Sequence, residues 1–170
     1  MRKYTLLLFL LLVALIFSLA PQTTLAQSTA SATKNGNLTF SEKEVAYVKS
    51  QRLARIATVS KKEQPDVAPV SCEFDGEVFY VGGRNNLATM KYRNVKNGQT
   101  RVTLVFDDWE SLEPWKPRFL KIHGTADIIT RKGQLGEGQY LRIAPQVKWS
   151  MGIDEPAFQN GKPVIKRMAK

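Results

Sequence analysis

The stretch from Glu77 to Asp108 constrains the fold most, because it sets a polar, glycine-containing turn between two strand-like segments. The first strand ends at Gly82-Gly83, and Asn85 or Asn86 can cap a short helix before strand character returns at residues 101–106. Glycines, helix-start amides, a hydroxyl and cations together suit a phosphate group. The alternative is a solvated basic helix after a hairpin, since charge runs usually face water. The polar residues between the strands are Arg84, Thr89, Lys91, Arg93 and Asn94.

Further strand-like segments surround this turn, and one helix precedes them. Ser41 and Glu44 form a capping box, which predicts a helix through about residue 52. Short helices beside antiparallel strands, without βαβ alternation, indicate a mainly β (α+β) domain built as a closed or nearly closed barrel. We expect Gly124 to ease a bend or bulge in its strand. The expected strands cover residues 55–60, 65–74, 77–81, 101–106, 119–130 and 141–149.

The ends of the chain differ from the middle. Arg2-Lys3, an apolar run over residues 6–16 and the small residues before Gln27 predict a signal peptide at 1–26, with an uncleaved membrane anchor as the alternative. No twin arginine precedes the apolar run, so we expect export of an unfolded chain that acquires any cofactor outside the cytoplasm. The remaining segments are a flexible linker at 27–37, a single globular domain at 38–153 and a basic tail at 154–170.

Several segments, in order along the chain, resemble the pyridoxamine 5′-phosphate oxidase-like split-barrel flavoproteins. They are QRLARIATV, PDVAPV, GGRNN, MKYRNV, RVTLVFDD and EPWKPRFLKIHGTAD, and the similarity extends over about residues 38–153. The branch that uses the deazaflavin coenzyme (F-420) is the more similar one. The resemblance implies a six-stranded antiparallel split β-barrel of the FMN-binding type. It also implies a homodimer with FMN or the deazaflavin at its interface.

The resemblance also assigns residues to the cofactor. Lys91 is the strongest phosphate candidate, because its stem can run along the barrel beside Tyr92 and deliver its ammonium group to the anion. The alternative for Val70 is a place in the barrel core. For Arg55 and Thr58, contact with the cofactor ring and a place in the barrel core both stay open. Trp115, in a proline-bracketed loop, matches a position near the cofactor across the dimer interface, and a core tryptophan is the alternative. The residues expected to line the cofactor ring are Arg55, Thr58, Pro69 and Val70. The turn over the ribityl chain is expected at Gly82, Gly83, Arg84 and Asn85. The residues expected near the phosphate are Thr89, Lys91, Tyr92 and Arg93.

The implied activity is hydride transfer between the bound cofactor and a small planar substrate, which requires little of side chains beyond positioning. Clustered His and Cys ligands are missing from the sequence, so no metal site is expected, and His123 reads as a surface or interface strand residue. Cys72 is expected to be a buried, inert thiol. One alternative is an exported, non-catalytic protein that binds a flavin, a haem or another planar anion. A membrane-surface or nucleic-acid partner, suggested by the net charge of +10, is disfavoured by export and dispersed cations.

Overall fold

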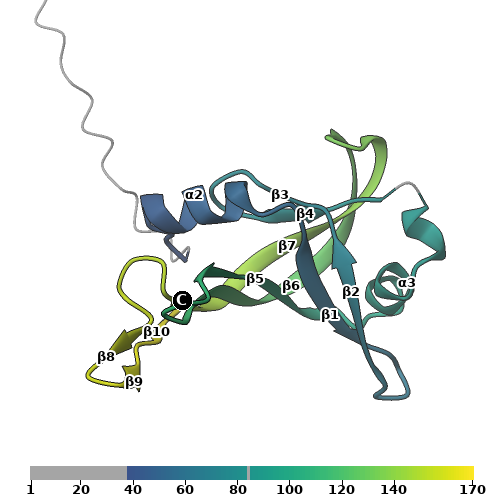
Figure 1. Ribbon diagram of the computed structural model, residues 1–170. Coiled ribbons are helices and arrows are strands. Elements are labelled where there is room, and N and C mark those ends of the chain that lie inside the picture. The colour runs from purple at the N-terminus through teal and green to yellow at the C-terminus, as the bar shows by residue number, and fades with distance from the viewer. Residues whose placement is uncertain (1–37, 84) are drawn as a thin grey trace, which may run out of the picture. The chain divides into compact units, whose positions relative to one another are not determined.

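The computed structural model describes residues 38–83 and 85–170, which form an eight-stranded antiparallel sheet with short helices beside it (Figure 1). The strand order is β2-β1-β5-β6-β7-β4-β3, β10 also pairs with β7, and β8 and β9 form a separate pair. The order ends at β2 and β3 without closing, so the sheet is a split barrel. The elements are α2 (Glu42–Ser50), β1 (Ala54–Val59), β2 (Pro65–Val70), β3 (Cys72–Phe74), β4 (Phe79–Val81), η1 (Asn86–Ala88), α3 (Met90–Lys96), β5 (Arg101–Ser111), β6 (Lys116–Gly133), β7 (Gly136–Met151), β8 (Phe158–Gln159), β9 (Lys162–Pro163) and β10 (Lys166–Ala169).

The expected signal peptide and linker, residues 1–37, lie outside the described residues. In the part of the chain that is described, no helix is long and apolar enough to cross a membrane. The segment expected as a basic tail contains β8, β9 and β10, and β10 joins the main sheet through pairs such as Arg167 with Trp149.

Helix α2 begins at the capping box that the sequence predicts. The Ser41 Oγ accepts a hydrogen bond from the Glu44 amide at 3.0 Å, and the Glu44 carboxylate accepts one from the Ser41 amide at 2.9 Å. Glu44 is buried and also pairs with the buried ammonium group of Lys148 on β7. The capping glutamate therefore fastens the helix to the sheet as well as starting it.

The expected strands are present, with boundaries that differ where tertiary pairing decides. The segment 65–74 splits at Ser71, because β2 pairs with β1 while β3 pairs with β4. Asp75-Gly76 forms the expected turn, in which the Asp75 carboxylate accepts hydrogen bonds from the amides of Glu77 and Val78, each at 2.9 Å. Strands β5, β6 and β7 extend further than local composition suggests, since long antiparallel ladders pair their ends.

The irregularity expected at Gly124 is confirmed. The β6–β7 ladder shifts register between His123 and Gly124, and Gly124 lies opposite Pro145. A Cβ atom at Gly124 would lie 2.5 Å from the Ala144 carbonyl oxygen, so only glycine fits here without a backbone shift. Pro145 has no amide proton for the ladder, and the register shift accommodates it.

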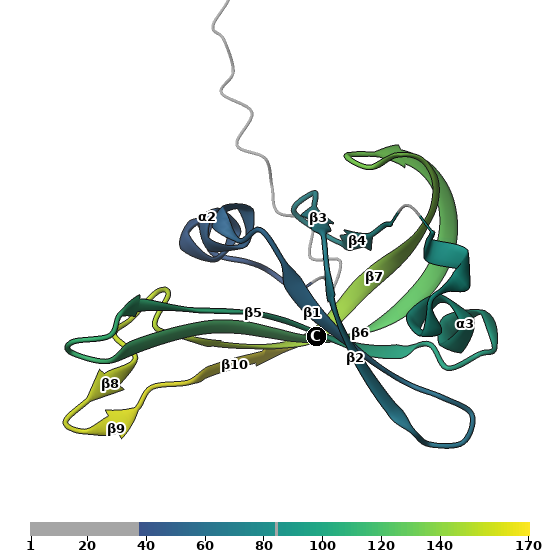
Figure 2. The same cartoon turned by 45° about the vertical axis from the view of Figure 1, so that its right-hand side comes forward.

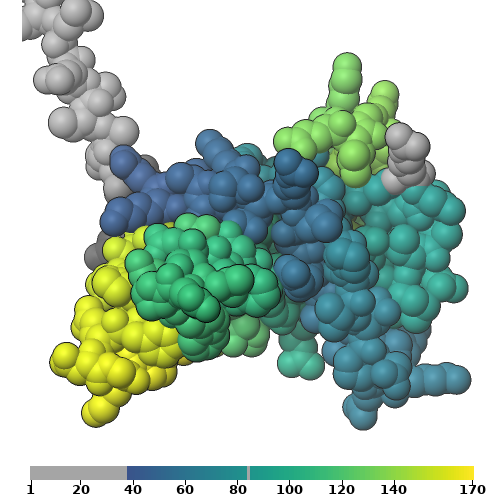
Figure 3. Space-filling model, in the orientation of Figure 1, coloured from purple at the N-terminus to yellow at the C-terminus, as the bar shows by residue number. Residues whose placement is uncertain are grey.

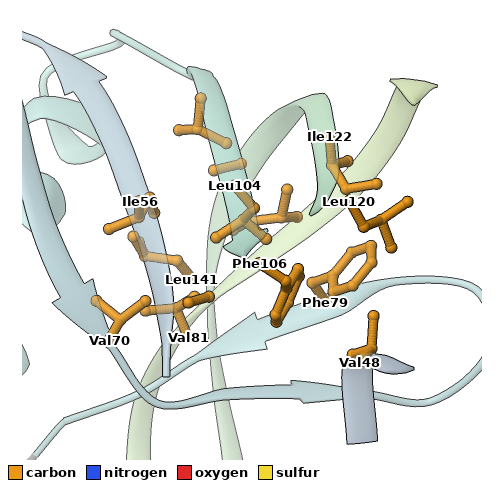
Figure 4. Packing of buried hydrophobic residues seen from close by; sticks show 14 of the residues in the cluster. Val48, Ile56, Val70, Phe79, Val81, Leu104, Phe106, Leu120, Ile122 and Leu141 are labelled. Atoms are coloured by element: carbon orange, nitrogen blue, oxygen red, sulfur yellow. The ribbon is translucent and has the colours of Figure 1, made fainter. Parts of the chain in front are cut away.

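The core fills the concave side of the sheet, where alternate residues of each strand point inward (Figure 4). Phe79 is fully buried and stacks on Phe74, with ring centroids 4.3 Å apart and planes 18° apart. Phe106 and Phe40 approach Phe79 with centroids at 5.8 Å and 5.7 Å. This aromatic cluster joins β3, β4, β5 and the chain just before α2, and so holds the split barrel together.

Candidate cofactor site

The convex face of the sheet carries one group of the expected site residues. Arg55 is exposed on β1 and lies directly opposite Pro69 on β2, so both side chains occupy the same face. The Arg55 guanidinium pairs with Asp107 at 2.5 Å. A shallow pocket of about 470 Å³ opens beside them. It is lined by Arg55, Ala57, Val67, Val105, Asp107, Phe119 and Lys121.

Thr58 and Val70 face the opposite side, in the core. Thr58 is 1% exposed, and its hydroxyl accepts a hydrogen bond from the Asn94 amide group at 2.9 Å. This bond ties α3 to β1. Asn94, whose role stays open from the sequence, is thus a buried link between the two elements. The structure does not bring Thr58 and Val70 together with Arg55 and Pro69, because strand alternation separates them.

The glycine turn follows β4 and leads into η1. Gly82 is buried, and a Cβ atom there would lie 2.3 Å from the Tyr140 ring, so the turn backbone packs directly on that ring. Gly83 and Asn85 are exposed, whereas Arg84 lies outside the described residues. Asn85 precedes η1 without a capping hydrogen bond from its side chain.

Asn86 follows Asn85 in the turn and is 4% exposed. It is not among the residues expected to bind the cofactor, yet its side chain places a polar Oδ1 atom in the interior. Its side-chain amide donates to the Gln139 carbonyl oxygen on β7 at 3.0 Å. Its Oδ1 is buried and has no hydrogen-bond partner among residues 38–83 and 85–170. Gln139 also accepts a hydrogen bond from the Tyr92 hydroxyl, which fixes α3 and the turn to the same residue of β7. A buried acceptor of this kind is suited to a ligand hydroxyl or amine.

Lys91 is the cationic residue of α3 whose side chain is buried. It is 8% exposed, and within the described residues no carboxylate forms an ion pair with it. Burial lowers the pKa of Lys91, and the charge of Asp66 on β2 offsets only part of that effect. An ammonium group in this setting attracts an anion strongly, because little water competes for it.

The other residues expected near the phosphate, Thr89, Tyr92 and Arg93, have surroundings different from those of Lys91. The Thr89 hydroxyl donates to the Asn86 carbonyl oxygen at 2.7 Å, which braces the step from η1 into α3. Tyr92 is buried, as its position beside the barrel requires. Arg93 is exposed, and its guanidinium contacts the Met90 sulfur at 3.0 Å.

Trp115 lies in the β5–β6 hairpin, whose tip is at the opposite end of the sheet from α3 in both ribbon views (Figures 1 and 2). The side chain is 57% exposed and contacts Phe158, with ring centroids 5.6 Å apart. The space-filling view shows the green hairpin surface between α2 and the yellow C-terminal segment (Figure 3). Within one chain, Trp115 is therefore separated from the Lys91 region.

Sequence reasoning missed the apolar and cationic side chains of the convex face. Val105, Lys121 and Trp149 follow one another in register from β5 to β7. The Lys121 ammonium group lies 4.2 Å from the Trp149 ring centroid. The two-residue alternation of β5 and β6 could have indicated this face, since Val102, Leu104 and Phe106 point inward.

The only histidine and the only cysteine of the sequence lie on different strands, His123 on β6 and Cys72 on β3. His123 is exposed on the convex face and packs edge-on against Trp149, and partial burial lowers its pKa. Burial raises the pKa of the Cys72 thiol to about 12, which keeps it protonated at neutral pH. Among the residues that the structure places, no group of three or more His, Cys, Asp or Glu side chains could hold a metal ion.

Comparison with known proteins links these features to one family. The family model described as pyridoxamine 5′-phosphate oxidase matches residues 40–160. A 5a,11a-dehydrotetracycline/5a,11a-dehydrooxytetracycline reductase of Streptomyces rimosus is 35% identical over 121 residues, which cover 68% of this chain and 84% of that protein.

Two solved structures share the fold. A Clostridium acetobutylicum protein related to general stress protein 26 of B. subtilis, of the pyridoxinephosphate oxidase family, is 14% identical with a TM-score of 0.53, covering 73% of this chain and 91% of that one. HupZ of Group A Streptococcus is 18% identical with a TM-score of 0.54, covering 66% of this chain and 94% of its own. At these identities the structures establish the split-barrel fold alone.

Proposed function

Because this chain belongs to the pyridoxamine 5′-phosphate oxidase family, we propose that it is an oxidoreductase that uses FMN or the deazaflavin coenzyme to reduce a flat organic substrate. Family membership and the reductase relative support a flavin-type oxidoreductase in general. The observation that carries the proposal on this chain is the buried Lys91 near the glycine turn, which forms no ion pair within residues 38–83 and 85–170.

The residues present fit a ribityl phosphate. We assign the phosphate to Lys91, whose desolvated ammonium group has no ion-pair partner in the described part of the chain. The Asn86 Oδ1 supplies an acceptor for a ribityl hydroxyl, and the close packing of Gly82 on Tyr140 holds the turn in place. We assign the flat ring to the shallow convex pocket beside Arg55 and Val105.

The bound cofactor would supply the hydride chemistry, so the protein residues have to bind, orient and exclude water. Reduction of the substrate would need a hydride at one atom, which a bound reduced cofactor would supply, and a proton at the conjugated neighbour, which solvent would supply. The relative named as a dehydrotetracycline reductase suggests a polycyclic, electron-poor substrate for this chain as well. Arg55 and Lys121 line the pocket and could orient a carbonyl oxygen of such a substrate.

An anaerobic titration tests this function. Purified protein is titrated with FMN and separately with the deazaflavin coenzyme while cofactor fluorescence is followed, and the reduced complex is then mixed with polycyclic quinones. We expect saturable binding of one cofactor and its reoxidation by the acceptor. Binding without reoxidation by any acceptor would favour the non-catalytic carrier, and absence of binding would reject both functions.

We further propose that the protein acts as a homodimer through the convex face. Val67 is 65% exposed there and lines the convex pocket together with the apolar side chains of Ala57, Val105 and Phe119. The β5–β6 hairpin, which carries Trp115, lies at the far end of the sheet from α3 in its own chain, so Trp115 would reach a cofactor near Lys91 from a second copy. Trp109 and Leu112, exposed near the same hairpin end, would be covered by that copy.

Replacing Val67 by aspartate should convert the dimer into monomers, because it places a charge in the centre of the apolar contact. We expect the mass measured by light scattering to halve and cofactor affinity to fall at least about tenfold, with the domain still folded. Leu135→Asp is the matched control, since Leu135 is exposed at the β6–β7 turn, away from that face. A dimer of unchanged mass in the Val67 variant would refute the assigned interface.

Export remains a prediction, since residues 1–26 lie outside the described residues. We propose that the protein is secreted or held in the cell envelope after cleavage near Ala26, with an anchored form as the alternative. Mass spectrometry of the N-terminus from fractionated cells distinguishes the cleaved form from the anchored one.

A further inference from the structure

One hollow in the described part of the chain lies away from the residues assigned to the cofactor. Its volume is about 630 Å³, a size typical of small-molecule sites, and its lining includes residues from the end of α2, from β3 and from the β6–β7 hairpin. Val48, Cys72 and Phe74 supply its apolar wall. None of the residues assigned above to the cofactor lines it.

Arg131, on β6, is held rigidly at the edge of this hollow, which we call the Arg131 pocket. One guanidinium nitrogen donates to the Glu73 carboxylate at 2.8 Å. The guanidinium carbon lies 4.0 Å from the Tyr80 ring centroid and 5.3 Å from that of Tyr140. Glu73 is itself oriented by the Gln134 amide at 2.9 Å. The Arg131 guanidinium is half-buried and held in place by these contacts. Its other N–H groups are available to hydrogen-bond a planar anion.

The residues that line the Arg131 pocket carry more positive than negative charges. Lys49 and Arg52, from the end of α2, also line it, and neither forms an ion pair with any described residue. The acidic groups are already satisfied: Glu73 by Arg131, and Asp75 by two backbone amides and the Tyr80 hydroxyl. A ligand with one negative charge and an apolar body would complement this wall.

We propose that the Arg131 pocket binds a small organic carboxylate with a flat apolar body. The carboxylate would pair with Arg131, with Lys49 and Arg52 at the rim, and the body would lie against Val48 and Phe74. This site is separate from the one proposed for the cofactor, so the protein would hold both ligands at once.

Titration of the purified protein with 2-naphthoate, followed by calorimetry, tests the site, with and without saturating FMN. We expect saturable binding with one equivalent per chain in both cases. Lys49→Gln/Arg52→Gln should weaken binding about fivefold or more, and Arg131→Gln at least about tenfold, because a charge-assisted hydrogen bond is lost. Arg131→Lys keeps the charge without the planar fork and should restore binding only in part.

The matched control is Lys61→Gln/Lys62→Gln, which removes two exposed cations from the β1–β2 turn and should leave the affinity unchanged. Unchanged affinity in Lys49→Gln/Arg52→Gln, a surface change that spares the core, would overturn the proposal even if Arg131→Gln does not fold. Inorganic phosphate serves as the competitor. If phosphate binds as tightly as 2-naphthoate, the apolar wall of the pocket contributes nothing to binding and the proposed ligand class is wrong.

Cys72 gives an independent readout, because it is the only cysteine of the chain and lines this pocket. Its pKa, raised by burial to about 12, makes its reaction with a thiol reagent slow at pH 8. Bound 2-naphthoate should slow the reaction several-fold further, whereas FMN should not. If 2-naphthoate binds and leaves the rate unchanged, it binds outside the Arg131 pocket; if it binds only when FMN is absent, it competes for the cofactor site. Either result overturns the proposal, whatever the outcome for the proposed oxidoreductase function.

Discussion

Replacing Phe79 by alanine should lower the free energy of unfolding by about 3–5 kcal/mol, the largest stability effect that we expect from one side chain. Phe79 is fully buried and contacts three other aromatic rings, so its removal leaves a cavity and takes away a stacked partner of Phe74. The cluster joins β3 and β4 to β5 and to the start of α2, which lie far apart in the sequence. Urea unfolding followed by circular dichroism measures the change.

The control for Phe79 is Leu135→Ala, an exposed apolar residue whose loss should change stability by less than about 0.5 kcal/mol. Phe79→Leu should fall between the two, since it keeps part of the buried volume. A loss below about 1 kcal/mol for the alanine variant would mean that the aromatic cluster does not hold the two halves of the barrel together.

Replacing Lys91 by methionine should change cofactor affinity and stability in opposite directions. Loss of the ammonium group should weaken FMN or deazaflavin binding about 10- to 100-fold, the effect of losing a hydrogen bond to a charged group. The cofactor-free protein should melt at a higher temperature, because the folded chain no longer holds a desolvated cation without an ion pair.

The pH dependence of stability checks the second effect. The pKa of Lys91 is lower in the folded chain than the unfolded value of 10.5, so the unfolded chain binds more protons between these two values. The destabilisation by Lys91 is therefore complete at neutral pH and disappears as the pH rises through the folded pKa toward 10.5. The melting temperatures of the native and Lys91→Met proteins should converge over that range.

Lys96→Gln is the control for Lys91, because Lys96 lies on the same helix but is exposed. It should change neither the affinity nor the melting temperature measurably. Equal cofactor binding by native and Lys91→Met protein would show that the phosphate lies elsewhere; a lower melting temperature for the cofactor-free variant would show that the lysine is already paired.

Several features could be read from the chain because neighbouring residues decide them. The capping box at Ser41 and the turn at Asp75-Gly76 depend on short-range hydrogen bonds and backbone freedom, and the glycine at 124 marked the position of the bulge that its pairing with β7 produces. Strand alternation likewise indicated the mainly β class, and the collinear motifs indicated the family. The assignment of each site residue to the cofactor stays a prediction.

Other features depend on contacts between segments far apart in sequence. Thr58 and Arg55 are three residues apart, yet one bonds Asn94 in the core and the other pairs with Asp107 on the convex face. The return of β10 to β7, the meeting of Asn86 and Tyr92 at Gln139, and the Arg131 pocket all arise from such contacts.

Local patterns thus determined which segments become strands, turns and a capped helix, since those choices depend on residues a few positions apart. Only the tertiary structure decided which cations lose water, which polar atoms lack partners and which surfaces face each other. The physical reason is that desolvation and pairing depend on every segment that packs around a group, and no local pattern contains that information.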